Sequence, residues 1–110
     1  QFGQPVGSFQ AIQHYLAEMA IAAKKVNHLA HSAAWSFSRD GYSIDRAAQA
    51  KIAASEKIPE LCWTAHQSHG AIGYTQEHDL HLYTRRALAW KTDFGDPAFH
   101  KAILAGAMGL

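Results

Sequence analysis

The chain has 110 residues, and its 10 Lys and Arg against 9 Asp and Glu give a formal net charge of +1. This length holds one domain with a real core, and it is small for an enzyme that encloses a large cofactor alone. The balanced charge gives no reason to expect nucleic acid or an anionic membrane as a partner. Apolar runs are short and broken by Lys, His or Glu, so neither a signal peptide nor membrane insertion is predicted.

The only cysteine is Cys62, which excludes an intrachain disulfide. A reducing, cytoplasmic compartment is therefore expected. The sequence begins with Gln1 rather than Met, so residues 1–110 are interpreted as an excised domain of a longer protein.

An irregular lead-in over residues 1–7 is followed by an apolar stripe that recurs at three- and four-residue steps from residue 9 to residue 33. This periodicity predicts a long helix that continues to about Arg39, with Ser8 as its N-cap. Asp40-Gly41 should end it. A helix of this length is typical of a bundle.

A second helix should open at Ser43 or Asp45 and end at Gly70, with a bend at Pro59. Small residues dominate its first half, so a neighbouring helix can approach closely. Three tryptophans along the chain, Trp35, Trp63 and Trp90, are expected in the core.

A third helix is predicted from about Glu77 to Lys91, with Thr75 as a possible N-cap and with Leu80, Tyr83, Ala87 and Trp90 facing inward. Asp96 before Pro97 is a natural N-cap and N1 pair for a short fourth helix to about residue 107. No stretch alternates with period two. The predicted fold is all-α, an up-and-down four-helix bundle.

Residues 67–80 link the second and third helices, and Gly70 and Gly73 interrupt the periodicity there. Glycines let a ligand or another backbone come close, and a new helix start could seat a phosphate. Local chemistry alone favours a plain connection between helices.

The eight histidines include three pairs with i, i+3 spacing: His28/His31, His66/His69 and His78/His81. Each pair would share one helix face, which is compatible with metal ligation. However, no carboxylate completes a helical zinc signature, so structural or surface histidines are favoured and no metal site is predicted.

Three blocks of sequence resemble the C-terminal helical domain of the acyl-CoA dehydrogenase family. The first is Gln-Phe-Gly-Gln-Pro-Val-Gly-Ser-Phe-Gln-Ala-Ile-Gln-His at residues 1–14, followed by Leu-Ala-Glu-Met-Ala at 16–20. The others are Gln-Ser-His-Gly-Ala-Ile-Gly-Tyr at 67–74 and Glu-His-Asp-Leu-His-Leu-Tyr-Thr-Arg-Arg-Ala at 77–87. They occur in the family's order and spacing and cover essentially the whole chain.

The resemblance implies a fragment of a flavoenzyme that oxidises an acyl-CoA thioester between Cα and Cβ, as in fatty acid β-oxidation and lipid metabolism. A carboxylate base takes the α-proton while hydride passes to FAD. It further implies an N-terminal helical domain and a middle β-domain in the same chain, subunits joined as dimers or dimers of dimers, and electron-transfer flavoprotein as electron acceptor. The wording of the third block resembles bacterial, especially actinobacterial, members.

The resemblance also implies which residues contact FAD. The cofactor lies across a subunit interface in this family, and the matching positions here are Gln1, Phe2, Val6, Phe9, Gln10 and Ile12 in the first block and Gln67, His69, Gly70 and Ala71 in the second. The family often has Gly where this chain has Ala71.

The catalytic position departs from the family. A Tyr-Glu-Gly-Thr run usually supplies the Glu base 27 residues after the matching Gln, and here that count from Gln67 reaches Phe94. Phenylalanine takes no proton, so no catalytic residue is assigned, although Gly95 and Asp96 remain expected flavin contacts. The base could lie on a helix that precedes Gln1, or a partner chain could supply it, with Asp96 as a less favoured substitute.

Two further readings stay open. The domain could be a non-catalytic subunit or helical assembly module of a heteromeric dehydrogenase, or it could be a histidine-rich bundle that binds a metal. The acyl-CoA substrate is otherwise the expected small-molecule partner.

Overall fold

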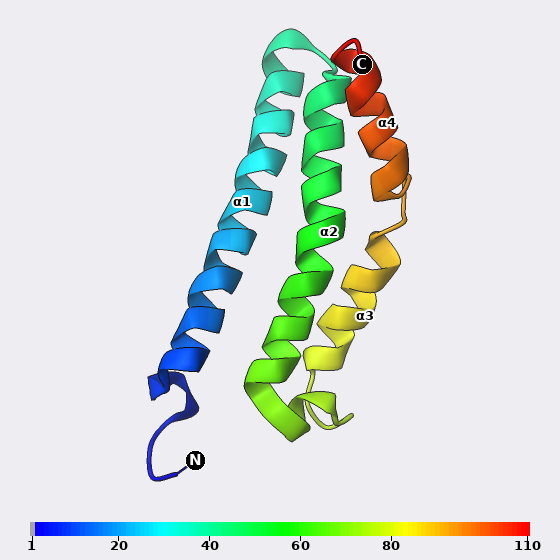
Figure 1. Cartoon of the computed structure of the whole chain (residues 1–110). Helices are drawn as coiled ribbons and strands as arrows, with labels where there is room; N and C mark the ends of the chain where they lie inside the picture. The colour runs from blue at the N-terminus through cyan, green and yellow to red at the C-terminus, as the bar shows by residue number, and fades with distance from the viewer. Residues whose placement is uncertain (1) are drawn as a thin grey trace.

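The protein is all-α, as the sequence predicts. The computed structural model describes residues 2–110 and contains no strand among them. Its elements are η1 (Val6–Ser8), α1 (Gln10–Asp40), α2 (Ile44–His69), η2 (Gly70–Tyr74), α3 (Leu80–Trp90) and α4 (Pro97–Ala107), where η denotes a 3₁₀-helix (Figure 1).

The helices form an elongated layer of 56 × 26 × 25 Å with α2 in the middle. The α1 helix lies along one side of α2, whereas α3 and α4 follow one another along the other side (Figure 1). In the described part of the chain the backbone of α1 does not approach that of α3 or α4: no Cα of α1 lies within 8 Å of a Cα of either helix. The whole arrangement therefore depends on packing against α2.

The buried apolar side chains are small, namely Ala48, Ala53, Cys62 and Ala87. Small side chains let helix backbones approach one another closely. This explains why the first half of α2 is rich in alanine. Burial also raises the pKa of the Cys62 thiol above its ordinary value.

The expectation that aromatic residues fill the core is wrong for this chain. Trp35, Trp63 and Trp90 are each at least half exposed, and Tyr83 is 70% exposed. On α3 only the small Thr84 and Ala87 are buried. Trp90, three residues after Ala87, borders a hollow against Lys51 and Ala54 of α2 but stays 58% exposed. In a layer with no further helix over its faces, such large side chains stay in contact with solvent.

Two predicted N-caps are also wrong. The Ser8 hydroxyl donates to the Pro5 carbonyl and closes η1, and α1 begins at Gln10 without a side-chain cap. The Thr75 hydroxyl donates to the Ile72 carbonyl at the end of η2. The α3 helix begins at Leu80, three residues later than predicted, because its first amide donates to Nδ1 of His78 instead of starting a turn at Glu77.

Other helix boundaries follow the sequence. Gly41 and Gly70 take φ values of 85° and 65°, and α1 and α2 end just before them. The α2 helix continues through the buried Pro59. No helix in the described chain has the length and apolar content needed to cross a membrane.

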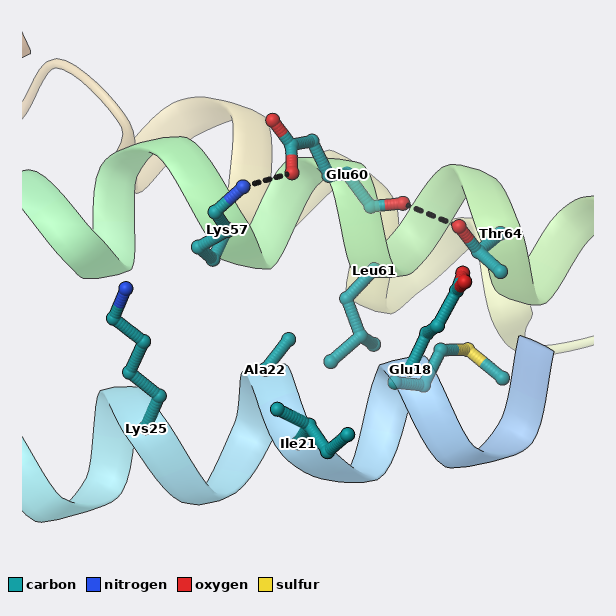
Figure 2. Close-up of a pocket in the computed structure, with 9 residues that line it drawn as sticks. Glu18, Ile21, Ala22, Lys25, Lys57, Glu60, Leu61 and Thr64 are labelled. Atoms are coloured by element: carbon teal, nitrogen blue, oxygen red, sulfur yellow. Dashed lines mark hydrogen bonds and ion pairs between the residues drawn. The ribbon is translucent and has the colours of Figure 1, made fainter. Parts of the chain in front are cut away.

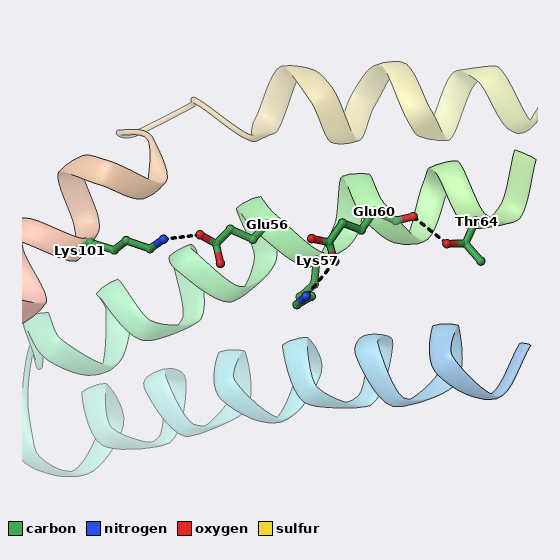
Figure 3. A network of polar contacts seen from close by, with 5 residues as sticks. All are labelled: Glu56, Lys57, Glu60, Thr64 and Lys101. Atoms are coloured by element: carbon green, nitrogen blue, oxygen red, sulfur yellow. Dashed lines mark hydrogen bonds and ion pairs between the residues drawn. The ribbon is translucent and has the colours of Figure 1, made fainter. Parts of the chain in front are cut away.

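Lysine side chains of two helices tie α3 and α4 to α2. The Lys51 ammonium donates to the Trp90 carbonyl at 2.6 Å, at the C-terminal end of α3. Figure 3 shows Lys101 of α4 reaching Glu56 of α2, with 2.6 Å between Nζ and Oε1. The outer helices are thus held at fixed positions along α2.

The cap of α4 gives a first prediction. The Asp96 carboxylate accepts from the Phe99 amide at 2.8 Å, and Pro97 occupies the first turn. Asp96→Ala should cost about 1 kcal/mol of helix stability. Hydrogen exchange of the α4 amides in the full-length protein should then be about fivefold faster. Asp93→Ala, at a position that caps no helix, should leave it unchanged; equal effects would contradict the cap.

The Glu56–Lys101 pair gives a pH prediction. Its hydrogen bond holds the pKa of Glu56 below the ordinary 4.5. A lowered folded-state pKa means that the pair stabilises the folded protein above pH 4.5 and loses this effect as pH falls through the folded value.

The difference in α4 protection between wild type and Lys101→Met should therefore be largest near neutral pH and vanish at acidic pH. Lys57→Met is the control and should have a smaller effect, because Lys57 is hydrogen-bonded to Glu60 inside α2 and makes no hydrogen bond to Glu56. A difference that persists unchanged into acid would contradict the assignment.

Candidate functional site

Two of the three sequence blocks meet at one end of the layer. A hollow of about 260 Å³ lies between the start of α1 and the end of α2. Its walls are formed by Phe2, Val6, Phe9, Ile12, Gln67, Ser68, His69 and Gly70. All of these except Ser68 were predicted as FAD contacts from the sequence. The prediction for Gln1 falls outside the described residues.

On the α1 side, the lead-in folds back on the helix that follows it. The Ser8 amide donates to the Pro5 carbonyl at 3.0 Å, and the Phe9 amide donates to the Val6 carbonyl at 3.2 Å. The rings of Phe2 and Phe9 meet edge to face at 6.2 Å. This turn places three apolar side chains, Phe2, Val6 and Phe9, on one wall of the hollow.

On the α2 side, hydrogen bonds within the last turns orient the polar wall. His69 Nδ1 lies 2.7 Å from the Ala65 carbonyl. A carbonyl only accepts, so Nδ1 carries a proton and donates it, which leaves Nε2 to face other partners. The Ser68 hydroxyl donates to the Thr64 carbonyl. Ser68 has no signal of its own in the sequence, and it lines the hollow because it stands between Gln67 and His69.

The absence of a side chain at Gly70 leaves its backbone accessible from the hollow. Its φ is 65°, and no atom lies within 4 Å of the place where a Cβ would stand. Backbone is therefore accessible at this point, as a planar ligand or phosphate requires. Ala71 and Gln10 are exposed nearby but do not line the hollow.

The residues present fit one part of a dinucleotide. Apolar side chains on one wall face an amide, an imidazole and exposed backbone on the other. Ligand sites usually have volumes of about 300–1,000 Å³ with mostly apolar walls and few polar groups. The hollow lies just below that range, so it would hold an end of FAD rather than the whole molecule.

Gly95 and Asp96 do not join this hollow within one chain. They lie in the α3–α4 connection beside the middle of α2, whereas the hollow lies at its end (Figure 1). The ion pair between Lys101 and Glu56 places the start of α4 beside Glu56 of α2. Gln67, at the hollow, lies about 16 Å further along the axis of α2 than Glu56. A glycine is needed at position 95 for packing within this connection, because a Cβ there would stand 2.5 Å from the Phe99 ring.

A larger groove of about 370 Å³ runs between α1 and α2 (Figure 2). Its apolar floor includes Ala22 and Leu61, and charged groups, including Glu18, Lys25, Lys57 and Glu60, stand along it. Lys57 and Glu60 pair with each other at 2.8 Å. No residue that the sequence predicted for the site lies there.

The histidines do not assemble a metal centre. Among residues 2–110, no group of three or more His, Cys, Asp or Glu side chains could hold a metal ion. His66 is hydrogen-bonded to Thr84, and the rings of His69 and His78 meet at 4.9 Å.

Comparison with known proteins decides the family. A family model described as "Acyl-CoA dehydrogenase, C-terminal domain" matches residues 1–109. The chain belongs to the acyl-CoA dehydrogenase family. It is 35% identical to the probable acyl-CoA dehydrogenase YngJ of Bacillus subtilis, over 96% of this chain and 28% of that protein. It is 37% identical to acyl-CoA dehydrogenase IpdE2 of Mycobacterium tuberculosis, over 79% of this chain and 26% of that protein.

A solved structure agrees with this assignment. A chain from the structure titled "Tcur3481-Tcur3483 steroid ACAD G363A variant" superposes with a TM-score of 0.90 at 26% identity. The match covers 99% of this chain and 30% of that one. These three proteins are thus about three to four times as long as this chain, which corresponds to the C-terminal domain of the family.

Gly73 gives a prediction for the candidate site. A Cβ at Gly73 would stand 2.9 Å from the His69 Cβ and 3.3 Å from the His66 carbonyl oxygen. Gly73→Ala must therefore push η2 away from the end of α2, at a cost of about 1–3 kcal/mol. The thermal unfolding midpoint of the full-length protein should fall.

The matched control is Gly106→Ala in α4, where a Cβ meets no atom within 4 Å. This change should stabilise the protein slightly, by about 0.5–1 kcal/mol. A Gly73→Ala variant as stable as wild type would show that η2 is not packed against α2 as described.

Proposed function

We propose that this domain completes the FAD site of an acyl-CoA dehydrogenase that removes two hydrogens from an acyl-CoA thioester. The observation that carries the proposal is the hollow at the end of α2. Sequence blocks almost sixty residues apart converge on it, and its walls consist almost wholly of the residues that the family resemblance assigns to FAD.

Bound FAD would supply the acceptor for the hydride removed from Cβ. The residues of this chain would bind and orient it. Phe2, Val6 and Phe9 would cover one side of it, while Gln67 and Nε2 of His69 would offer polar contacts on the other. The open space at Gly70 admits close approach to the backbone.

The separation of the hollow from Gly95 and Asp96 supports an assembly of several subunits. One end of a cofactor in the hollow of one copy would leave its other end to be met by a second chain. We therefore propose a homo-oligomer or a heteromer with a related subunit, with the N-terminal and middle domains of the same chain completing the site. Electron-transfer flavoprotein is the proposed electron acceptor, and a cytoplasmic location agrees with the single, buried Cys62.

Phe94 favours a second candidate function, that of a non-catalytic subunit. This residue stands where the family has its Glu base, it is 95% exposed, and its φ is 60°. A left-handed backbone costs about 1–2 kcal/mol for a residue with a Cβ. A bulky side chain held in this way on the surface supplies no proton acceptor, so the base must come from elsewhere in the chain or from a partner.

The test is purification of the full-length protein with measurement of bound FAD and of acyl-CoA oxidation with an artificial electron acceptor. FAD should be present, and residues 1–110 alone should be inactive. Gln67→Ala should weaken FAD binding by about tenfold, the loss expected for one buried hydrogen bond. Gln76→Ala, in the exposed turn before α3, is the matched control.

The outcomes separate the two functions. Activity of the full-length protein alone places the base in the same chain, whereas activity only after addition of a related subunit identifies a non-catalytic half. A full-length protein that binds no FAD, either alone or with the related subunit, would overturn both proposed functions.

A further inference from the structure

The largest buried side chain in the described part of the chain is an imidazole. His66 is 3% exposed, whereas the buried apolar side chains are small: three alanines, a cysteine and Pro59. Burying a polar ring costs free energy unless its polar atoms find partners. A leucine would fill such a position at lower cost, so the contacts of His66 call for an explanation.

One contact joins α2 to α3. His66 Nε2 lies 2.7 Å from Thr84 Oγ1, and Thr84 Oγ1 lies 3.3 Å from the Leu80 carbonyl. The hydroxyl has one proton, and the carbonyl accepts it. Hence Nε2 carries the ring proton and donates to Thr84. Nδ1 has no partner in either tautomer, and the opposite assignment would bury an unpaired N–H there, which is rarer in proteins than an unpaired acceptor.

A second contact joins the same ring to η2. The Tyr74 ring stacks on His66 with 4.8 Å between centroids and 30° between planes, and Trp63 lies at 5.7 Å. Gly73 of η2 also packs tightly on this turn, because a Cβ there would stand 2.9 Å from the His69 Cβ and 3.3 Å from the His66 carbonyl oxygen. One side chain therefore fixes the last turn of α2 against two neighbouring segments.

The residues beside His66 are those that line the hollow. Gln67 follows it directly, and His69 and Gly70 complete the turn. Terminal turns of helices fray unless tertiary contacts hold them. The anchor is specific in direction, because it holds the α3 side of α2 while the hollow lies toward α1.

We infer that His66, through its hydrogen bond to Thr84, is a positioning residue that sets the polar wall of the proposed FAD site. The inference rests on the proposed function. His66 does not line the hollow itself, and its effect passes through the backbone of residues 67–70.

The experiment alters Thr84 rather than His66, because removal of the ring would open a cavity. Thr84→Val keeps the shape and removes the acceptor, and Thr84→Ser restores the hydroxyl. Ser55→Ala is the control: Ser55 is a buried hydroxyl on α2 without a partner among the described residues, far from the hollow. The full-length protein is stripped of FAD and titrated with it, and the visible circular dichroism of the bound flavin is recorded.

Thr84→Val should weaken FAD binding by about tenfold, the expected loss for a broken buried hydrogen bond, and should change the flavin spectrum. The FAD affinity of Thr84→Ser should stay within about threefold of the wild-type affinity. The FAD affinity of Ser55→Ala should equal that of wild type. Thr84→Val with unchanged FAD affinity and spectrum, well below its unfolding temperature, would overturn the inference.

A separate measurement distinguishes failure of the inference from failure of the proposed function. If wild type binds no FAD, the proposed function fails and the cofactor titration says nothing of His66. Hydrogen exchange of residues 67–74 then decides whether His66 still sets this turn. Faster exchange in Thr84→Val than in Thr84→Ser and Ser55→Ala supports the positioning role, and equal exchange in all three overturns it.

Discussion

Close packing of small side chains on α2 is the constraint on which the rest of the structure depends. Ala48, Ala53 and Cys62 are buried on this helix, and Ala87 is buried on α3. Because the backbone of α1 does not approach that of α3 or α4 in the described chain, the main interfaces that hold the layer together are those with α2. A larger side chain in this seam would push the backbones apart, and overpacking of this kind is costly. Polar contacts such as Lys101–Glu56 then fix the outer helices along α2.

The helices could be predicted well from the sequence, because apolar periodicity and the residues that begin or end a helix are local properties. Gly41, Gly70 and the Asp96-Pro97 pair end or begin helices through their own backbone preferences. Caps that depend on longer-range geometry were missed. Ser8 and Thr75 both bond to carbonyls three residues earlier, so they close short 3₁₀ turns and leave the following helix without a side-chain cap.

Burial was the least predictable property, for a physical reason. Apolar periodicity shows that one face of a helix avoids water, but it does not show whether the covering surface belongs to the same chain. Trp35, Trp63 and Trp90 are exposed here, while His66 is buried. The hollow could be anticipated only through resemblance to a family, because nothing local in Phe2 or Gln67 indicates that the two residues will share a wall.

The central position of α2 also makes it a mechanical link. One of its ends forms a wall of the hollow, and its middle lies beside the α3–α4 connection, which contains Phe94. Because the backbones of the outer helices do not approach one another, α2 is the element that both sides share. The hollow and the α3–α4 connection are therefore set at their distance by the length of one helix.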